Sequence, residues 1–377
     1  MNFWDSIDYN NARKVLVIPN ITNSSNIEKD SFIDVIHNHI KGLEKYGDYY
    51  WHILVPSGNV TKKLNLPNVK QHQIDIPGDM MNQRSFPSDK LIRLLKDIDY
   101  DVIYSHLPDW VQVGRYKKTI DTKIIGYCHW WEMKCCNGID RRAGKAKWLW
   151  LPIELLGISQ MDTCYLNTQD QKNRVLKEAK ETFNDDFVNR LDDILEVWNL
   201  GLEESKIVSE QNPNKENIIV FNHRAAAYKG YPKFMELMEE YRKHRQDFVV
   251  WIPQLKGKSP YGWVDNTKVP KHQYYKRLQN CKVGIQMRQT NYGWSVSGTD
   301  CMMNGTPMIW QESDCYKEID PNGMFFKYKK DLFNFLDNIL NNDSFRYHQE
   351  KQSLERANEL SKNENIMLSK LHQKLSN

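Results

Sequence analysis

Short apolar runs alternate with helical segments along this chain, and the series starts twice. The first series holds the apolar runs 13–19, 50–55, 101–105, 122–127 and 162–167, with helix-period segments at 32–46, 90–98 and 169–180. The second series starts at Ile218 and continues with the runs 248–252, 282–286 and 307–310, with helices over 274–280 and from about Ser297. Apolar strands that alternate with helices indicate a parallel sheet covered on both faces. The sequence therefore predicts an α/β protein with two such units.

The chain is long enough for more than one hydrophobic core. At 377 residues, two domains are the natural expectation. The polar stretch 203–217, rich in Glu, Asn, Ser and Lys, separates the two series and is the best candidate for a linker. We therefore predict domains at 1–200 and 201–330, followed by C-terminal helices at 331–377 that pack back across them.

Composition limits the partners and the compartment that we expect. Lys plus Arg exceeds Asp plus Glu by 52 − 48 = 4, an excess that by itself indicates no polyanionic partner. No apolar run approaches the roughly 18 residues of a membrane span, and the first residues lack the pattern of a signal peptide. We expect a cytoplasmic protein without stable membrane insertion, in the host cytoplasm if it is viral.

The cysteines favour a reducing compartment. There are seven, an odd number, and their spacing suggests no disulfide framework. Cys128, His129 and the pair Cys135 and Cys136 invite a zinc interpretation, but their spacing matches no CxxC pair. We therefore predict no metal site and no cofactor.

A basic loop follows the first strand of the second series. The β-branched run Ile218-Ile219-Val220 leads into a short polar segment that holds Arg224 and Lys229, and an amphipathic helix follows. A strand that ends in a basic loop facing a helix is a suitable place to hold a diphosphate. The alternative is a solvated loop without a ligand.

The order of these features resembles the retaining GT-B glycosyltransferases of the sucrose-synthase-like group. The resemblance covers roughly 199–319 and rests on four features in this order: the junction Asn199 to Gly201, the spacing of Arg224 from Lys229-Gly230, the helix and strand QYYKRLQNCKVGIQM, and the segment Asp300–Gly305–Pro307. It implies two Rossmann-like parallel-sheet domains that face a central cleft. Residues 1–200 would be the acceptor side, and 201–330 would bind a nucleotide sugar.

The resemblance also implies roles for particular residues. Arg224 and Lys229 would hold the donor diphosphate and stabilise the charge that develops on it. Asp300 would bind the ribose hydroxyls, and the segment from Ser297 to Asp300 also resembles a capping box at a helix start, a structural role that could coexist with ribose binding. His129 would lie near the reacting sugar. Tyr292 stands where the family has its earlier Glu, and with Gly293, Trp294 and Ser295 it completes the predicted donor site.

The acceptor is suggested by a segment rich in Trp and in basic residues. It includes Trp130, Trp131, Arg141, Arg142, Lys145 and Lys147. Cations interleaved with aromatic rings suit a phosphodiester backbone and exposed bases. The same residues could supply the stacking and phosphate contacts that a flipped base needs. The alternative is a helix whose Trp side chains pack inside the domain and whose cations are solvated.

The predicted reaction is therefore transfer of a hexosyl or pentosyl group from a nucleotide sugar, with UDP as the expected nucleotide. The first acceptor that we consider is a 5-hydroxymethylpyrimidine in double-stranded DNA, as in bacteriophage DNA-modifying glycosyltransferases. One alternative is a saccharide or lipid acceptor in surface polysaccharide or lipopolysaccharide synthesis. An alternative of another class is a non-enzymatic nucleic-acid-binding protein. The sugar and the oligomeric state stay open.

Overall fold

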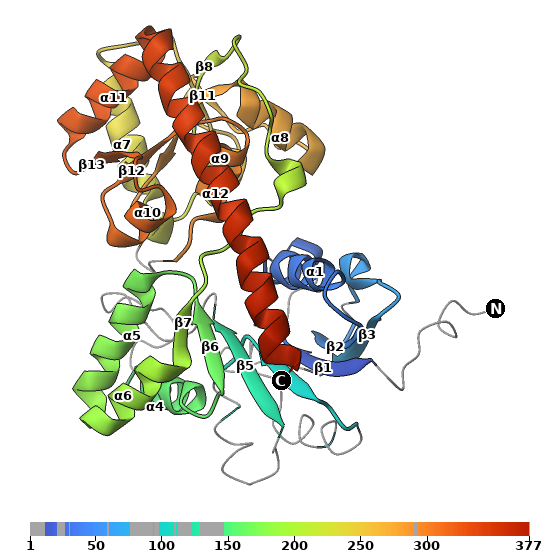
Figure 1. Ribbon diagram of the computed structural model, residues 1–377. Coiled ribbons are helices and arrows are strands. Elements are labelled where there is room, and N and C mark those ends of the chain that lie inside the picture. The colour runs from blue at the N-terminus through green and yellow to red at the C-terminus, as the bar shows by residue number, and fades with distance from the viewer. Residues whose placement is uncertain are drawn as a thin grey trace. The chain divides into compact units, whose positions relative to one another are not determined.

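The computed structural model describes residues 12–20, 27–29, 31–58, 60–75, 93, 98–108, 111, 122–128, 147–289 and 293–376. The chain divides into two compact units, Met1–Trp198 with Asn365–Asn377, and Asn199–Glu364. Figure 1 shows the strands of the first unit in blue to green and those of the second from yellow-green to red-orange. Among the described residues, no helix has both the length and the apolar character needed to cross a membrane.

The sheet of the first unit is parallel throughout its described part. Its strands lie in the order β3-β2-β1-β4-β5-β6-β7. Their bounds are β1 Arg13–Ile18, β2 Tyr49–Pro56, β3 Val69–Ile74, β4 Val102–Ser105, β5 Lys123–Cys128, β6 Thr163–Leu166 and β7 Leu195–Val197. The helices in the described part are α1 Ser31–Leu43, α4 Lys147–Ile158, α5 Gln169–Thr182 and α6 Asp185–Ile194, with short 3-10 turns at Ile27–Lys29 and Lys62–Leu64. The central strands β4, β5 and β6 are almost entirely buried, as expected of a sheet covered on both faces.

The described residues of the second unit repeat the plan with a six-stranded parallel sheet, in the order β10-β9-β8-β11-β12-β13. Its strands are β8 Glu216–Val220, β9 Val249–Trp251, β10 Val264–Asp265, β11 Cys281–Gln286, β12 Met308–Gln311 and β13 Met324–Phe326. Its helices are α7 Tyr231–Arg242, α8 Lys271–Asn280, α9 Val296–Met303, α10 Asp314–Ile319 and α11 Lys329–Asn341, with 3-10 turns at Glu204–Lys206 and Ala227–Lys229. The helix α12, Asp343–Ser376, starts in this unit, and its last turns belong to the first.

Each end of α12 is fixed within its own unit. In the second unit, Arg346 donates to Glu350 at 2.6 Å, and the Lys215 ammonium lies 3.7 Å from the same carboxylate oxygen. All three side chains are buried. In the first unit, the Arg13 guanidinium donates to the carbonyl of Leu375 at 2.9 Å. Buried charge pairs therefore hold the start of α12, and a hydrogen bond to the backbone holds its end.

The two-sheet α/β architecture predicted from the sequence is confirmed. The edge strand β3 was not predicted, because its sequence VKQHQI is polar at its four central positions. The short strands β7, β10 and β13, of three, two and three residues, were not predicted either, because so few residues offer no pattern. The helix expected from about Ser297 begins at Val296, and its N-cap is Ser295, whose hydroxyl accepts from the Gly298 N–H at 3.1 Å. The interpretation of Ser297 to Asp300 as a capping box is therefore wrong, because the N-cap is Ser295 and the third helical residue after it is Gly298.

Candidate functional site

The carboxyl end of β8 carries the basic loop that the sequence singled out. Gly230 closes this loop in the left-handed conformation, with φ of 75°. A Cβ at this position would lie 2.5 Å from Cβ of Met287, which follows β11. Only glycine fits both the conformation and the space. The glycine therefore lets the loop after β8 pack directly against the end of β11.

The two cations of this loop lie near each other without an acidic partner. Arg224 is exposed, and the Lys229 ammonium donates to the amide oxygen of Gln289, just beyond β11. Neither side chain forms a salt bridge within the part of the chain that the structure describes. Burial and then the charge of Arg224 lower the pKa of Lys229 to about 8. Two like charges that destabilise each other form a site that an anion would stabilise.

The N-terminus of α9 lies against the same loop. The amide nitrogen of Asn222 donates to the carbonyl of Ser297 at 3.0 Å, and the Ser297 hydroxyl lies 3.1 Å from Nδ1 of His223. At Gly298, a Cβ would lie 2.4 Å from the ring of Trp310, so α9 packs closely on β12. The first backbone N–H groups of a helix bind an anion favourably. The start of α9 therefore adds hydrogen-bond donors to the positive charges of Arg224 and Lys229.

Asp300 lies on α9, one turn after Ser297. Its carboxylate accepts from the hydroxyl of Tyr274 on α8 at 3.1 Å, and its side chain is half-buried. Burial and then the charge of Asp300 raise the pKa of the Tyr274 phenol well above its ordinary value, so Tyr274 stays a donor. The hydrogen bond from Tyr274 thus orients the Asp300 carboxylate.

A buried polar network that was not predicted from the sequence connects these elements. Gln286, at the end of β11, accepts from Ser295 at 2.5 Å and from Nε2 of His223. Burial, and then the charge of Lys229, lower the pKa of His223 to about 3, so the ring is neutral. The position of His223 directly before Arg224 was the available signal, since it places the ring at the carboxyl end of β8.

Three buried polar atoms at this site have no hydrogen-bond partner among the described residues. They are the amide oxygen of Asn222, the amide nitrogen of Gln289 and the indole N–H of Trp294. All three side chains are at least nine-tenths buried, at 3%, 3% and 5% exposed. Native structures leave few such atoms unpaired, so one acceptor and two donors remain for a bound molecule or water to satisfy.

Some of the remaining predicted site residues lie in the part of the chain that the structure describes, and the others lie outside it. Gly293, Trp294 and Ser295 lead into α9, with Trp294 and Ser295 buried. Lys147 begins α4, but its side chain is not described. Outside the described residues lie His129, Tyr292, Trp130, Trp131, Arg141, Arg142 and Lys145. The predicted acceptor segment therefore has no structural account.

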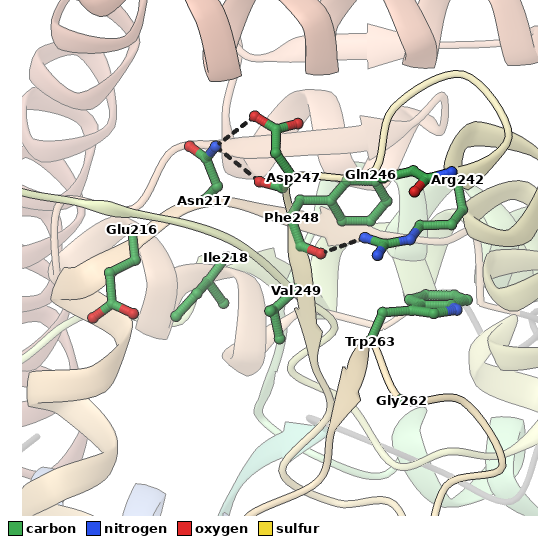
Figure 2. Close-up of a pocket in the computed structure, with 10 residues that line it drawn as sticks. All are labelled: Glu216, Asn217, Ile218, Arg242, Gln246, Asp247, Phe248, Val249, Gly262 and Trp263. Carbon is green, nitrogen blue, oxygen red and sulfur yellow. Dashed lines mark hydrogen bonds between the residues drawn. The ribbon is translucent and has the colours of Figure 1, made fainter.

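A separate pocket opens at the opposite, amino-terminal ends of β8 and β9 (Figure 2), with a volume of about 520 Å³. Its main polar groups bond to one another: the Asn217 amide donates to the backbone carbonyl and the carboxylate of Asp247, at 2.9 and 3.2 Å. The Arg242 guanidinium donates to the carbonyl of Phe248 at 2.8 Å and lies 5.9 Å from the Trp263 ring centre. With these groups satisfied, we assign no reaction to this pocket.

No group of three or more His, Cys, Asp or Glu side chains in the described part of the chain could hold a metal ion. Of the four residues considered for zinc, only Cys128 is described, and it lies on β5.

Comparisons with known proteins agree on the architecture. No protein-family model matches the sequence, and the search of curated proteins found no relative. Solved structures do match. The Anabaena protein HepE in complex with UDP and glucose is 9% identical, with a TM-score of 0.68 over 97% of this chain and 99% of that chain. Sucrose-phosphate synthase from Thermosynechococcus elongatus is 11% identical, with a TM-score of 0.67 over 97% of this chain and 99% of that chain.

A third match is trehalose-6-phosphate synthase, in a study of enzymatic glycosyltransfer with retention. It is 13% identical, with a TM-score of 0.66 over 96% of this chain and 99% of that chain. At identities of 9 to 13%, these likenesses establish the fold and leave activity to be argued from the site. The GT-B fold predicted from the sequence is confirmed.

Proposed function

We propose that this protein is a glycosyltransferase that moves a sugar from a UDP-sugar to a hydroxyl acceptor, with retention of the anomeric configuration. One observation carries the proposal. Arg224 and Lys229 lie on one loop without a carboxylate partner among the described residues, and residues of that same loop bond to the start of α9. This combination of charges and backbone donors suits the diphosphate of a nucleotide sugar.

The structural neighbours support the donor and the stereochemistry. HepE was solved with UDP and glucose, and trehalose-6-phosphate synthase was studied for transfer with retention. We extend both properties to this chain because its cations occupy the loop at the carboxyl end of β8, in a sheet of the same architecture.

The proposed chemistry follows from where charge develops. As the bond between the anomeric carbon and the diphosphate oxygen breaks, negative charge grows on the departing diphosphate. The fixed charges of Arg224 and Lys229 stabilise that charge more than they stabilise the intact donor, which lowers the barrier. The acceptor oxygen then bonds to the anomeric carbon, and its proton passes to the departing phosphate oxygen. No separate protein base is needed for this step.

Other residues complete the proposed site. Asp300 would bind the ribose hydroxyls, His129 would lie near the transferred sugar, and Tyr292 with Gly293 to Ser295 would line the donor. We also propose that the reaction needs no metal ion, because the two cations take the charge-neutralising role. Activity that persists in EDTA would support this, and activity restored only by a divalent ion would contradict it.

The acceptor that we propose to test first is 5-hydroxymethylpyrimidine in double-stranded DNA. Its support is the sequence of 130–147 alone, where Trp and basic residues are interleaved. A saccharide acceptor has different support, since two structural neighbours are named as synthases of sugar phosphates. The two acceptors differ in salt dependence, because phosphate contacts to DNA weaken steeply as salt increases.

The experiment is to incubate the protein with a panel of nucleotide sugars and DNA containing 5-hydroxymethylcytosine. The DNA is then digested, and the masses of the nucleosides are measured by mass spectrometry. A mass gain of one sugar residue supports both donor and acceptor. Release of nucleoside diphosphate without a mass gain supports the transferase proposal and contradicts the DNA acceptor, so saccharide acceptors would be tested next. No release and no gain with any donor would contradict the proposed function.

A further inference from the structure

The directions of the hydrogen bonds around Gln286 can be assigned from its neighbours. Its amide nitrogen lies 2.8 Å from the carbonyl of Met287 and 3.0 Å from the hydroxyl of Tyr316. A backbone carbonyl can only accept, so the NH₂ group must be on that side. The amide oxygen of Gln286 must then face Ser295 and Nε2 of His223 and accept from both.

This fixes the tautomer of His223. Since the Gln286 oxygen only accepts, Nε2 must carry a hydrogen. The ring is neutral, because burial and the charge of Lys229 lower its pKa to about 3. Nδ1 therefore carries a lone pair. The Ser297 hydroxyl, 3.1 Å from Nδ1, must be the donor in that contact.

The orientation of Ser297 has a consequence for any ligand. Its only hydroxyl hydrogen is directed at His223, so only oxygen lone pairs are available to a bound molecule. Ser297 is half-buried, with its backbone carbonyl held by Asn222. Asp300 lies three residues later, on the same side of α9 and about 5–6 Å away between Cβ atoms. The carboxylate of Asp300 also accepts only.

We propose that Ser297 determines specificity and that His223 is its positioning residue: the neutral imidazole holds the Ser297 hydroxyl as an acceptor for a ribose hydroxyl of the bound nucleoside diphosphate. Two acceptors on one face of a helix suit the two hydroxyls of a ribose. They do not suit a phosphate oxygen, which can only accept. The inference rests on the proposed function and adds that the Ser297 side chain recognises the ribose of the donor.

The first test measures discrimination between ribose and deoxyribose. Binding of UDP, GDP, ADP and CDP, and of their 2′-deoxy and 3′-deoxy forms, is measured by calorimetry with wild-type protein, Ser297→Ala and Ser297→Thr. We expect wild-type protein to bind one deoxy form at least about fivefold more weakly than the ribose form. Ser297→Ala should bring that ratio close to 1, and Ser297→Thr, which keeps the hydroxyl, should preserve it.

A matched pair of substitutions tests His223. An Asn side chain places its amide oxygen near the position of Nδ1, so His223→Asn keeps an acceptor for Ser297. A Gln side chain places its amide nitrogen near Nε2, so His223→Gln keeps the donor to Gln286 and loses that acceptor. We expect His223→Asn to preserve the discrimination and His223→Gln to lose it. A merely structural role would weaken ribose and deoxy forms equally in both variants.

A measurement on the unaltered protein covers the case in which a variant does not fold. In protein with ¹⁵N-labelled histidine, His223 should show a protonated Nε2 and an unprotonated Nδ1 near pH 7, with and without UDP. The opposite tautomer would overturn the assignment. An unchanged ratio in Ser297→Ala, or equal weakening of all forms, would overturn the role of Ser297 alone. Failure of all four ribonucleoside diphosphates to bind wild-type protein would overturn the proposed function as well.

Discussion

Donor binding should weaken as the pH rises above about 8, and Lys229 is the reason. In the ligand-free protein, burial and the nearby Arg224 lower the pKa of Lys229 from 10.5 to about 8. A bound diphosphate supplies the missing negative charge and returns the pKa toward its ordinary value. Binding at high pH must therefore take up a proton, and proton uptake becomes costlier as the pH rises.

The magnitude follows from the protonated fraction. With a pKa of about 8, about nine-tenths of the Lys229 side chains are charged at pH 7 and about one-tenth at pH 9. The dissociation constant for UDP should therefore rise about tenfold between these values. The terminal phosphate, with a second pKa of about 6, changes charge little over most of this range. The folding stability of the ligand-free protein has the opposite pH dependence to donor binding. Because the pKa of Lys229 is lowered in the folded state, that state gains stability as the pH rises from about 8 toward 10.5.

The assay is calorimetric titration with UDP at pH 7, 8 and 9, on wild-type protein and on Lys229→Arg. Arginine stays charged throughout, so the variant should bind with little pH dependence. Lys215, whose pKa burial lowers to about 8, is present in both proteins and is controlled by the comparison. An equal loss of affinity in wild type and Lys229→Arg would refute the reasoning, because the titrating group would then lie elsewhere.

Three further predictions concern the same unit. Gly230→Ala should lower the free energy of unfolding by about 2–4 kcal/mol, through the positive φ and the contact with Met287; urea denaturation measures it, and a change below about 1 kcal/mol would contradict the geometry. Lys215→Met leaves the Glu350 carboxylate buried with one cation fewer and should cost about 3 kcal/mol in the same assay, whereas an unchanged midpoint would show that the pair contributes nothing. Arg224→Ala should lower the rate of donor turnover about 100-fold with the fold intact, since its side chain is exposed; turnover within a few-fold of wild type would remove Arg224 from the reaction.

The sequence predicted the strands that lie inside the sheets because burial on both faces leaves an apolar run. The segments RKVLVI and KIIGYC are examples, and both are strands in the structure. The same logic fails at the edges. Within the described part of the chain, the polar strand β3 pairs with β2 alone, and β13, a strand of three residues, pairs with β12 alone. An edge position removes the apolar signal, and a short strand offers too few residues for a pattern.

The candidate site was predictable only in part. The spacing of Arg224 and Lys229 could be recognised in the sequence, because both belong to one short segment that directly follows β8. The network of His223, Gln286 and Ser297 joins residues 63 and 74 positions apart, so no local pattern reveals it. The direction of each hydrogen bond depends on the three-dimensional contacts of Gln286. Roles for His129 and Tyr292 stay predictions, because both lie outside the described residues.

The central claim is that the loop after β8 and the start of α9 bind and activate a nucleotide sugar. The most direct measurement is release of nucleoside diphosphate from a panel of nucleotide sugars by wild-type protein and by the double variant Arg224→Ala with Lys229→Met. We predict that wild-type protein releases the nucleotide from at least one donor and that the folded double variant releases none above background. Equal release by both proteins, or none by wild type with any donor and any tested acceptor, would contradict the account.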